Sequence, residues 1–192
     1  MSYEPPRPPV RGLLLTPEDR EAPARVRRLR GLGLGERPDA GLDAVAHHLA
    51  GLTGTPYAMV NFIGEERQFF AGLRVPETLT ADGGHGGGPG LGRTLPREYG
   101  FCTHVVARRR ALALEDVRDY PRFAGNPVVD GYGIHAYLGA PLIDSTGMVL
   151  GTVCVADLRP RPWGRSGLET IKATATDLTA RLERREHDGL PL

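Results

Sequence analysis

Two long apolar runs in the C-terminal half of the chain limit its possible folds most strongly. They cover Ile134–Ile143 and Met148–Ala156, and only Asp144–Ser145–Thr146–Gly147 separates them. An Asp at the start and a Gly at the end of so short a linker are typical of a tight turn. The two runs therefore predict a β-hairpin whose strands lie at the centre of a sheet.

Further segments predict the rest of this sheet. Tyr57–Ile63 is rich in β-forming residues, and Gln68–Leu73 follows it after a turn at Gly64–Glu65–Glu66, which predicts a second hairpin. Ala111–Val117 predicts another strand, and the turn-rich connection Arg118–Gly133 after it has room for one short helix. Because the strands come in hairpins, we expect an antiparallel sheet.

Three helices are expected before the last strands. Thr16–Pro17–Glu18–Asp19 offers a capping residue, a first-turn proline and acids near the positive helix end, so it predicts a helix start. We interpret the arginines between Arg20 and Arg30 as a solvated face and not as a nucleic-acid patch, because no aromatic residues alternate with them. Residues 40–53 have apolar residues at helical spacing, and residues 98–109 predict a short helix.

The last predicted helix has an apolar seam. Ser166 and Glu169 have the spacing of a capping box. The apolar residues of the seam then follow at spacings of three and four: Leu168, Ile171, Ala175, Leu178 and Leu182. The seam can pack on the chain's own sheet, or pair with the first helix or with a second subunit, and these arrangements can coexist. Pairing with a second subunit predicts a homodimer.

The order of these elements predicts an α+β fold with helices on both faces of a central antiparallel sheet. The terminal helices would cover one face. The short helix and long loops would cover the other and leave space for a cleft. We divide the chain into residues 1–37, a flexible leader plus the N-terminal helix; residues 38–186, the domain; and residues 187–192, a C-terminal tail.

Bulk properties narrow the class of protein. A net charge of +1 gives no general attraction to nucleic acid or to membranes. No apolar run approaches the roughly 20 residues of a membrane helix, and Met1–Arg11 lacks the apolar core of a signal peptide. Two cysteines fit a reducing compartment, so we expect a cytoplasmic protein. The histidines and cysteines show no metal-binding motif and no clustered ligands in the sequence, so no metal site is expected. The Gly-rich segment Ala81–Gly92 lacks the neighbouring strand, helix and Lys of a phosphate loop, and we interpret it as a flexible insertion.

Several segments, taken in order, resemble the GAF domain family, in particular bacterial GAF domains found beside sensor kinases and diguanylate cyclases. The resemblance spans residues 38–186. The segments that carry it, besides the last helix, are Leu42–Phe70, Gly100–Val106, Ala111–Val129 and Ile134–Trp163. It implies a sheet of about six strands and a pocket under the loop-rich face. Members of the family bind cyclic nucleotides, bilins, haem, amino acids or other small effectors, and many only dimerise.

The resemblance also implies which residues face the pocket. The ligand-binding candidates are Phe101, Cys102, Val105, Asp116, Phe123, Asn126, Tyr132 and Tyr137. In this interpretation Asp116 and Asn126 orient a polar ligand, and Phe123 and Tyr137 stack on a planar one. Asn126 precedes a proline, so a turn-forming role is favoured for it, whereas both roles stay open for Asp116.

Cys102 and His104 invite a catalytic interpretation that helix geometry opposes. Residues two apart point about 200° away from each other on a helix, so they do not form a nucleophile and base pair. His104 is then expected on another side of the helix, nearer solvent or a neighbouring loop. A bilin site commonly has a Cys directly followed by His, and a haem site needs an axial His, for which His104 and His135 are candidates. These features are too incomplete to assign either cofactor.

The sequence therefore predicts a cytoplasmic, non-catalytic sensor or regulatory domain that binds an unidentified small molecule. It would act through dimerisation or through a signalling partner protein, and neither nucleic acid nor a membrane is an expected partner. One alternative is a thiol-based redox sensor or reductase that uses Cys102, with Cys154 as a buried strand residue. The other is a structural dimerisation module without a ligand.

Overall fold

The computed structural model describes residues 16–76 and 91–188. The predicted leader at residues 1–15, most of the Gly-rich segment Ala81–Gly92 and the last residues of the predicted tail lie outside the described residues. Within the described part of the chain, no helix is both long enough and apolar enough to cross a membrane.

Six antiparallel strands form one sheet in the order β3-β2-β1-β6-β5-β4. The strands are β1 (Tyr57–Ile63), β2 (Arg67–Arg74), β3 (Thr94–Pro96), β4 (Leu112–Leu114), β5 (Ala136–Ile143) and β6 (Val149–Asp157). Both predicted hairpins are confirmed, and the apolar run of β6 lies in the middle of the sheet, where every residue is buried. The predicted strand Ala111–Val117 is shorter than expected, and β3 was missed because three residues carry almost no periodic signal.

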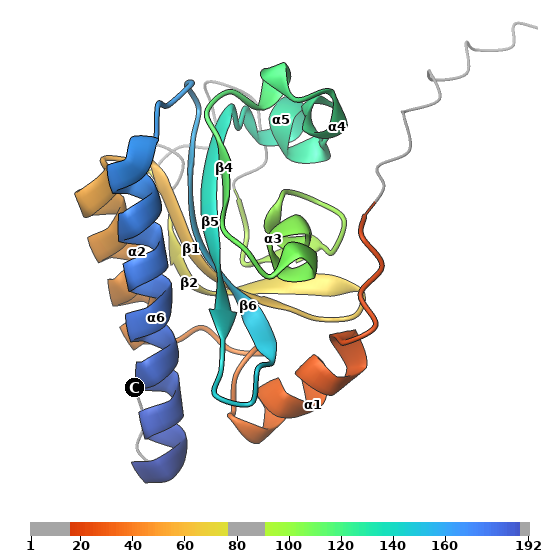
Figure 1. Ribbon diagram of the computed structural model, residues 1–192, viewed down its shortest axis with the longest axis vertical. Coiled ribbons are helices and arrows are strands. Elements are labelled where there is room, and N and C mark those ends of the chain that lie inside the picture. The colour runs from red at the N-terminus through yellow and green to blue at the C-terminus, as the bar shows by residue number, and fades with distance from the viewer. Residues whose placement is uncertain (1–15, 77–90, 189–192) are drawn as a thin grey trace, which may run out of the picture.

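Helices cover both faces of the sheet, as the sequence predicted (Figure 1). The longer ones are α1 (Ala22–Gly31), α2 (Ala40–Thr53) and α6 (Gly164–Asp188). The shorter ones are α3 (Cys102–Arg108), the 3-10 turn η2 (Val117–Asp119), α4 (Pro121–Ala124) and α5 (Pro127–Tyr132). The α2 and α6 helices lie on one face, and α3, α4 and α5 lie on the other (Figure 1). The connection after β4 thus holds more helix than the one short segment that was predicted.

The predicted helix ends agree with the structure only in part. The α2 helix matches residues 40–53, because the Asp39 carboxylate accepts from the backbone N–H groups of Gly41 and Leu42 and caps its start. The capping box of the last helix is wrong, since α6 begins at Gly164 and Ser166 lies inside it. The start at Thr16 is also wrong, since α1 begins at Ala22.

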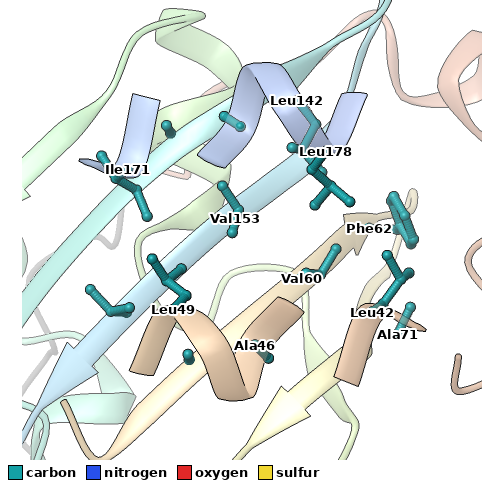
Figure 2. Packing of buried hydrophobic residues seen from close by; sticks show 14 of the residues in the cluster. Leu42, Ala46, Leu49, Val60, Phe62, Ala71, Leu142, Val153, Ile171 and Leu178 are labelled. Atoms are coloured by element: carbon teal, nitrogen blue, oxygen red, sulfur yellow. The ribbon is translucent and has the colours of Figure 1, made fainter. Parts of the chain in front are cut away.

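The face under α2 and α6 is a continuous apolar core. In Figure 2 the side chains of Leu49 of α2 and Ile171 of α6 point toward the sheet. They lie on two sides of Val153, a residue of β6. The seam of α6 belongs to this core: Ile171, Ala175, Leu178 and Leu182 are buried, and Leu168 packs against its edge. Of the alternatives that the sequence left open, the seam therefore packs on its own sheet.

The interpretation of the first helix as an arginine-rich solvated face is wrong for Arg25. Its side chain is completely buried, and its guanidinium binds the Asp19 carboxylate at 2.7 and 2.9 Å and the carbonyl oxygen of Val149 in β6. Burial alone would raise the pKa of Asp19, but the hydrogen bond and charge of Arg25 lower it overall. Arg28 likewise binds Asp144 at 2.9 Å and Glu186 of α6. These pairs fix α1 across the end of the sheet.

Candidate functional site: a small cavity above paired thiols

A cavity of about 50 Å³ lies between the α3–α5 layer and the sheet. Its walls are almost entirely apolar or aromatic, and they come from strands, from α3 and α5, and from the segments before them. Four of the ligand-binding candidates predicted from the sequence line this cavity: Phe101, Cys102, Tyr132 and Tyr137. Leu91, Tyr99 and Tyr132 are only partly buried, so they form the rim toward solvent.

Tyr137 reaches the floor of this cavity because of a glycine. A Cβ atom at Gly139, two residues along β5, would collide with the Tyr137 hydroxyl. The open position lets the Tyr137 ring fold along the strand and meet Phe101, with ring centroids 5.2 Å apart. Phe101 in turn meets the edge of Phe123 at 5.7 Å. An aromatic group thus holds the start of α3 against the sheet.

The two cysteines meet below the cavity. Cys102 Sγ lies 3.8 Å from Cys154 Sγ and 3.3 Å from the Tyr137 hydroxyl, and both thiols are free and buried. Hydrogen bonding from Cys154 lowers the pKa of Cys102 against the opposing effect of burial. The same contact, together with burial, raises the pKa of Cys154 well above the usual thiol range. One proton of the pair is therefore lost more easily than the other.

A buried polar network continues from these thiols along the sheet. Asn61 Nδ2 donates to Gln68 Oε1 at 2.6 Å, and Gln68 Nε2 donates to the carbonyl oxygens of Pro96 and Tyr99. Asn61 Oδ1 and Thr152 Oγ1 are buried without a hydrogen-bond partner. Both side chains contribute to the lowered pKa of Cys102, although neither of these two oxygen atoms forms a hydrogen bond.

His104 lies away from the thiols, as the helix geometry predicted, and of the two expected surroundings it packs against the neighbouring connection and not toward solvent. Its ring packs on the edge of Phe123 in α4, with centroids 4.9 Å apart, and only 7% of the residue is exposed. Burial, assisted by the positive charges of Arg122 and Arg108, lowers its pKa to about 4. At neutral pH the imidazole is therefore uncharged.

The structure brings only part of the predicted site together. Phe101, Cys102, Tyr132 and Tyr137 line the cavity, whereas Val105 and Phe123 are buried in the apolar cluster around it. That any of these residues binds a ligand remains a prediction. Phe123 does not offer an open ring for stacking, because Phe101, His104 and Tyr120 surround it.

The two polar candidates do not border the cavity. Asn126 Oδ1 accepts from the backbone N–H groups of Gly100 and Val128, and Asn126 Nδ2 donates to the Gly100 carbonyl. It therefore caps α5 and ties this helix to the segment before α3, which is the turn-forming role favoured from the sequence. Asp116 caps the η2 turn and pairs with Arg118 at the surface, which lowers its pKa to about 2.

The contribution of β1, β2 and β6 to the walls of the cavity was not predicted from the sequence. Tyr57 and Met59 of β1 and Gln68 and Phe70 of β2 line it, together with Ala156 of β6. Each pair is separated by two positions, the spacing of residues on one face of a strand. That alternation was present in the sequence, but the uniform burial of β1 hides which face is special.

The size and lining of this cavity do not fit the haem and bilin alternatives. Ligand pockets for molecules of that size span roughly 300–1,000 Å³, so a cavity of about 50 Å³ does not fit either group. Neither His104 nor His135 is among the residues that line it. No group of three or more His, Cys, Asp or Glu residues in the described part of the chain is arranged to hold a metal ion.

The chain is similar to a known protein family and to one curated protein. The family model for the GAF domain matches residues 37–182. A cyclic di-GMP phosphodiesterase of Pseudomonas aeruginosa is 32% identical over 111 residues, which cover 56% of this chain and 16% of that protein. The chain thus spans less than a fifth of the length of this curated relative.

Solved structures agree at the level of the fold. The GAF domain of an Acinetobacter phosphoenolpyruvate-protein phosphotransferase has a TM-score of 0.57 at 15% identity, covering 90% of this chain and 99% of that one. The free methionine-R-sulfoxide reductase of Neisseria meningitidis, solved with its substrate, has a TM-score of 0.61 at 14% identity, covering 91% and 96%.

Proposed function

Because the chain belongs to the GAF domain family, whose members are typically sensory or regulatory signalling domains, we propose that it binds a small molecule in the cavity above Cys102 and Tyr137 and relays this binding to a partner. The observation that carries the proposal is the cavity itself, an unfilled space with almost entirely apolar walls between the short helices and the sheet. It lies under the layer of short helices, which are easier to displace than the long helices of the opposite face.

The lining indicates the class of ligand. Its walls are apolar, and the Tyr137 hydroxyl and Cys102 thiol are polar groups at its floor. Burial raises the pKa of Tyr137 well above its usual range, so this hydroxyl stays protonated and can donate. We propose a ligand that is mainly apolar and has one hydrogen-bond acceptor. A ligand larger than about 50 Å³ would have to push α3 and α5 outward.

We propose a binding role and not a catalytic one, acting in the cytoplasm, where buried free thiols stay reduced. Among the described lining residues there is no His, Asp or Glu to move a proton. The cyclic di-GMP phosphodiesterase relative suggests an output that is read by a signalling protein.

Homodimerisation is a separate proposal and needs a surface other than the α6 seam, because that seam packs on the sheet. Sedimentation of the full chain tests it, and a mass of one chain at all concentrations would refute it. A dimer that binds no small molecule would instead support the structural dimerisation module.

A thermal-shift screen of the reduced full chain tests ligand binding. The probes are small aromatic and aliphatic carbonyl compounds, amino acids, cyclic nucleotides and haem. We expect a rise in the melting temperature with a compound of the first class. The variant Ala156→Val, which fills the cavity, should abolish that rise, and Ala113→Val on β4, outside the lining, should keep it. No shift with any probe would refute the proposal.

A further inference from the structure

We propose that Cys102 and Cys154 form a reversible intramolecular disulfide in response to hydrogen peroxide, with Cys102 as the thiol that is oxidised first and Cys154 as the thiol that completes the bond. This inference goes beyond the proposed ligand binding and does not depend on it. It rests on the position of the two sulfur atoms, which are 52 residues apart in sequence and 3.8 Å apart in space.

The distance between the sulfurs is short enough for a bond after a local adjustment. A disulfide is about 2.05 Å long, so the two atoms must approach each other by a little under 2 Å. Cys154 is fixed in β6, which is hydrogen-bonded to β1 and β5 on its two sides. Cys102 is the first residue of α3 and lies two residues after Gly100, whose φ is +78°. A change of side-chain torsion and a small shift of the first turn of α3 are therefore the expected movement.

The cavity assigns different roles to the two cysteines. Cys102 lines the cavity and is 5% exposed, whereas Cys154 is 0% exposed and is not a lining residue. The cavity of about 50 Å³ exceeds the roughly 10–15 Å³ of cavity volume that is needed to hold one water molecule. It can admit hydrogen peroxide but not a thiol the size of glutathione. The oxidant therefore meets Cys102 first.

The surroundings of Cys102 favour the reactive thiolate. Hydrogen bonding from Cys154, and to a smaller extent from Tyr137, lowers the pKa of Cys102 although burial opposes it. The unpartnered Asn61 Oδ1 is a second, independent sign of chemistry here, because a buried carbonyl oxygen without a donor is unfavourable. It can accept a hydrogen bond from the S–OH group that forms when Cys102 is oxidised.

The reaction balances in two steps. The Cys102 thiolate attacks one oxygen of hydrogen peroxide, the O–O bond breaks, and the departing hydroxide takes up a proton to become water, which leaves Cys102 as a sulfenic acid. The Cys154 sulfur then attacks Cys102 Sγ, the S–O bond breaks, and the sulfenic oxygen leaves as a second water with the Cys154 proton. Two thiols are oxidised to one disulfide, and one peroxide is reduced to two waters.

The test uses the reduced full chain, treated with stoichiometric hydrogen peroxide, quenched with an alkylating agent and analysed by intact mass and peptide mapping. We expect the mass to fall by two hydrogen atoms, a cross-linked peptide pair containing Cys102 and Cys154 within one chain, and recovery of both thiols with dithiothreitol. Cross-links only between chains, or no cross-link at peroxide levels that oxidise free cysteine, would overturn the proposal.

Variants test the two roles. Cys154→Ala should leave a sulfenic acid on Cys102 that a dimedone-type reagent traps, and Cys102→Ala should leave Cys154 unoxidised. Equal oxidation of Cys154 in Cys102→Ala would contradict the assignment. If either variant does not fold, Tyr137→Phe gives an independent readout, since it keeps both thiols and the ring. It should slow oxidation about fivefold through the loss of one hydrogen bond. An unchanged rate would contradict the activation of Cys102 by its surroundings, on which its role as the first oxidised thiol rests.

Discussion

The two faces of the sheet bury different kinds of side chain. Under α2 and α6 the buried cluster is mainly aliphatic (Figure 2). Phe62 and Trp163 are its buried aromatic residues, and Phe69 packs against its edge. Under α3, α4 and α5 the cluster contains both cysteines and several tyrosines. The buried polar residues on that side of the sheet or in its helices include Asn61, Gln68, Thr152, His104 and Asn126.

This difference indicates that one face stabilises the fold and that the other responds to a ligand or an oxidant. Aliphatic packing stabilises a fold without introducing any chemistry, so the α2/α6 face can be rigid and inert. Buried polar groups are unfavourable unless they are hydrogen-bonded, and an unfilled cavity forfeits packing contacts. The α3–α5 face accepts both, which is expected where a protein binds a ligand or carries a reactive group.

Truncation in the α2/α6 face should have the largest effect. Leu178→Ala removes a buried side chain of α6 and should reduce the free energy of unfolding by about 4 kcal/mol. Leu52→Ala on α2, which is 60% exposed, should change it by less than about 0.5 kcal/mol. Urea denaturation measures both. If the two variants lost equal stability, α6 would not be part of the rigid face.

The α3–α5 face should depend on hydrogen bonds more than on packing. Asn126→Ala removes the cap of α5 and leaves the Gly100 amide and carbonyl without their partner. We expect a loss of about 2–3 kcal/mol in urea denaturation. Asp130→Ala, an exposed change in the same helix, should be close to neutral. A neutral Asn126→Ala would mean that this face is held by apolar contacts alone.

Acid should weaken the α3–α5 face through His104. Its pKa is about 4 in the folded protein and 6.5 in the unfolded chain, so between these values the unfolded state binds more protons. Stability therefore falls as the pH falls from 6.5 to 4, by about 2 kcal/mol once solvent screening is allowed for. Denaturation across this range should show the slope in the wild-type chain and in the exposed-site variant His47→Gln. The slope should be smaller in His104→Phe, and an equal slope in all three would contradict this origin.

The smallest change in stability is expected for a pair of variants that compares the packing of the two faces directly. Ala156→Val adds two methyl groups beside the cavity and should change stability by less than about 1 kcal/mol. Ala140→Val adds the same groups beneath the α2/α6 helices, where the core is filled, and should cost about 1–3 kcal/mol. If Ala156→Val were the more harmful change, the cavity would not be available space.

Local patterns in the sequence predicted much of this fold. The hairpins, α2 and the buried seam of α6 follow from periodicity over neighbouring residues. The helix start at Thr16 was wrong because Asp19 binds Arg25 and, at 3.0 Å, Arg97, which is 78 residues away. A capping signal cannot reveal that its carboxylate is used in a tertiary ion pair.

The site was less predictable for the same reason. The segment around Cys102 was correctly placed as a pocket wall, but the approach of Cys154 depends on how α3 sits on β6. The polar candidates Asp116 and Asn126 have ordinary capping sequences, and capping is what the structure shows for them. The unpartnered side-chain oxygen atoms of Asn61 and Thr152 carry no sequence signal, because polar residues in strands are common at surfaces.

The claim that the α3–α5 face is the responsive one is tested most directly by amide hydrogen exchange on the full chain, before and after peroxide treatment. We predict that amides of α3 (Cys102–Arg108) exchange through openings of lower free energy than those of α2 and α6, and that oxidation changes exchange mainly in α3. Equal protection in all three helices, or a change centred on α2 and α6, would contradict the account.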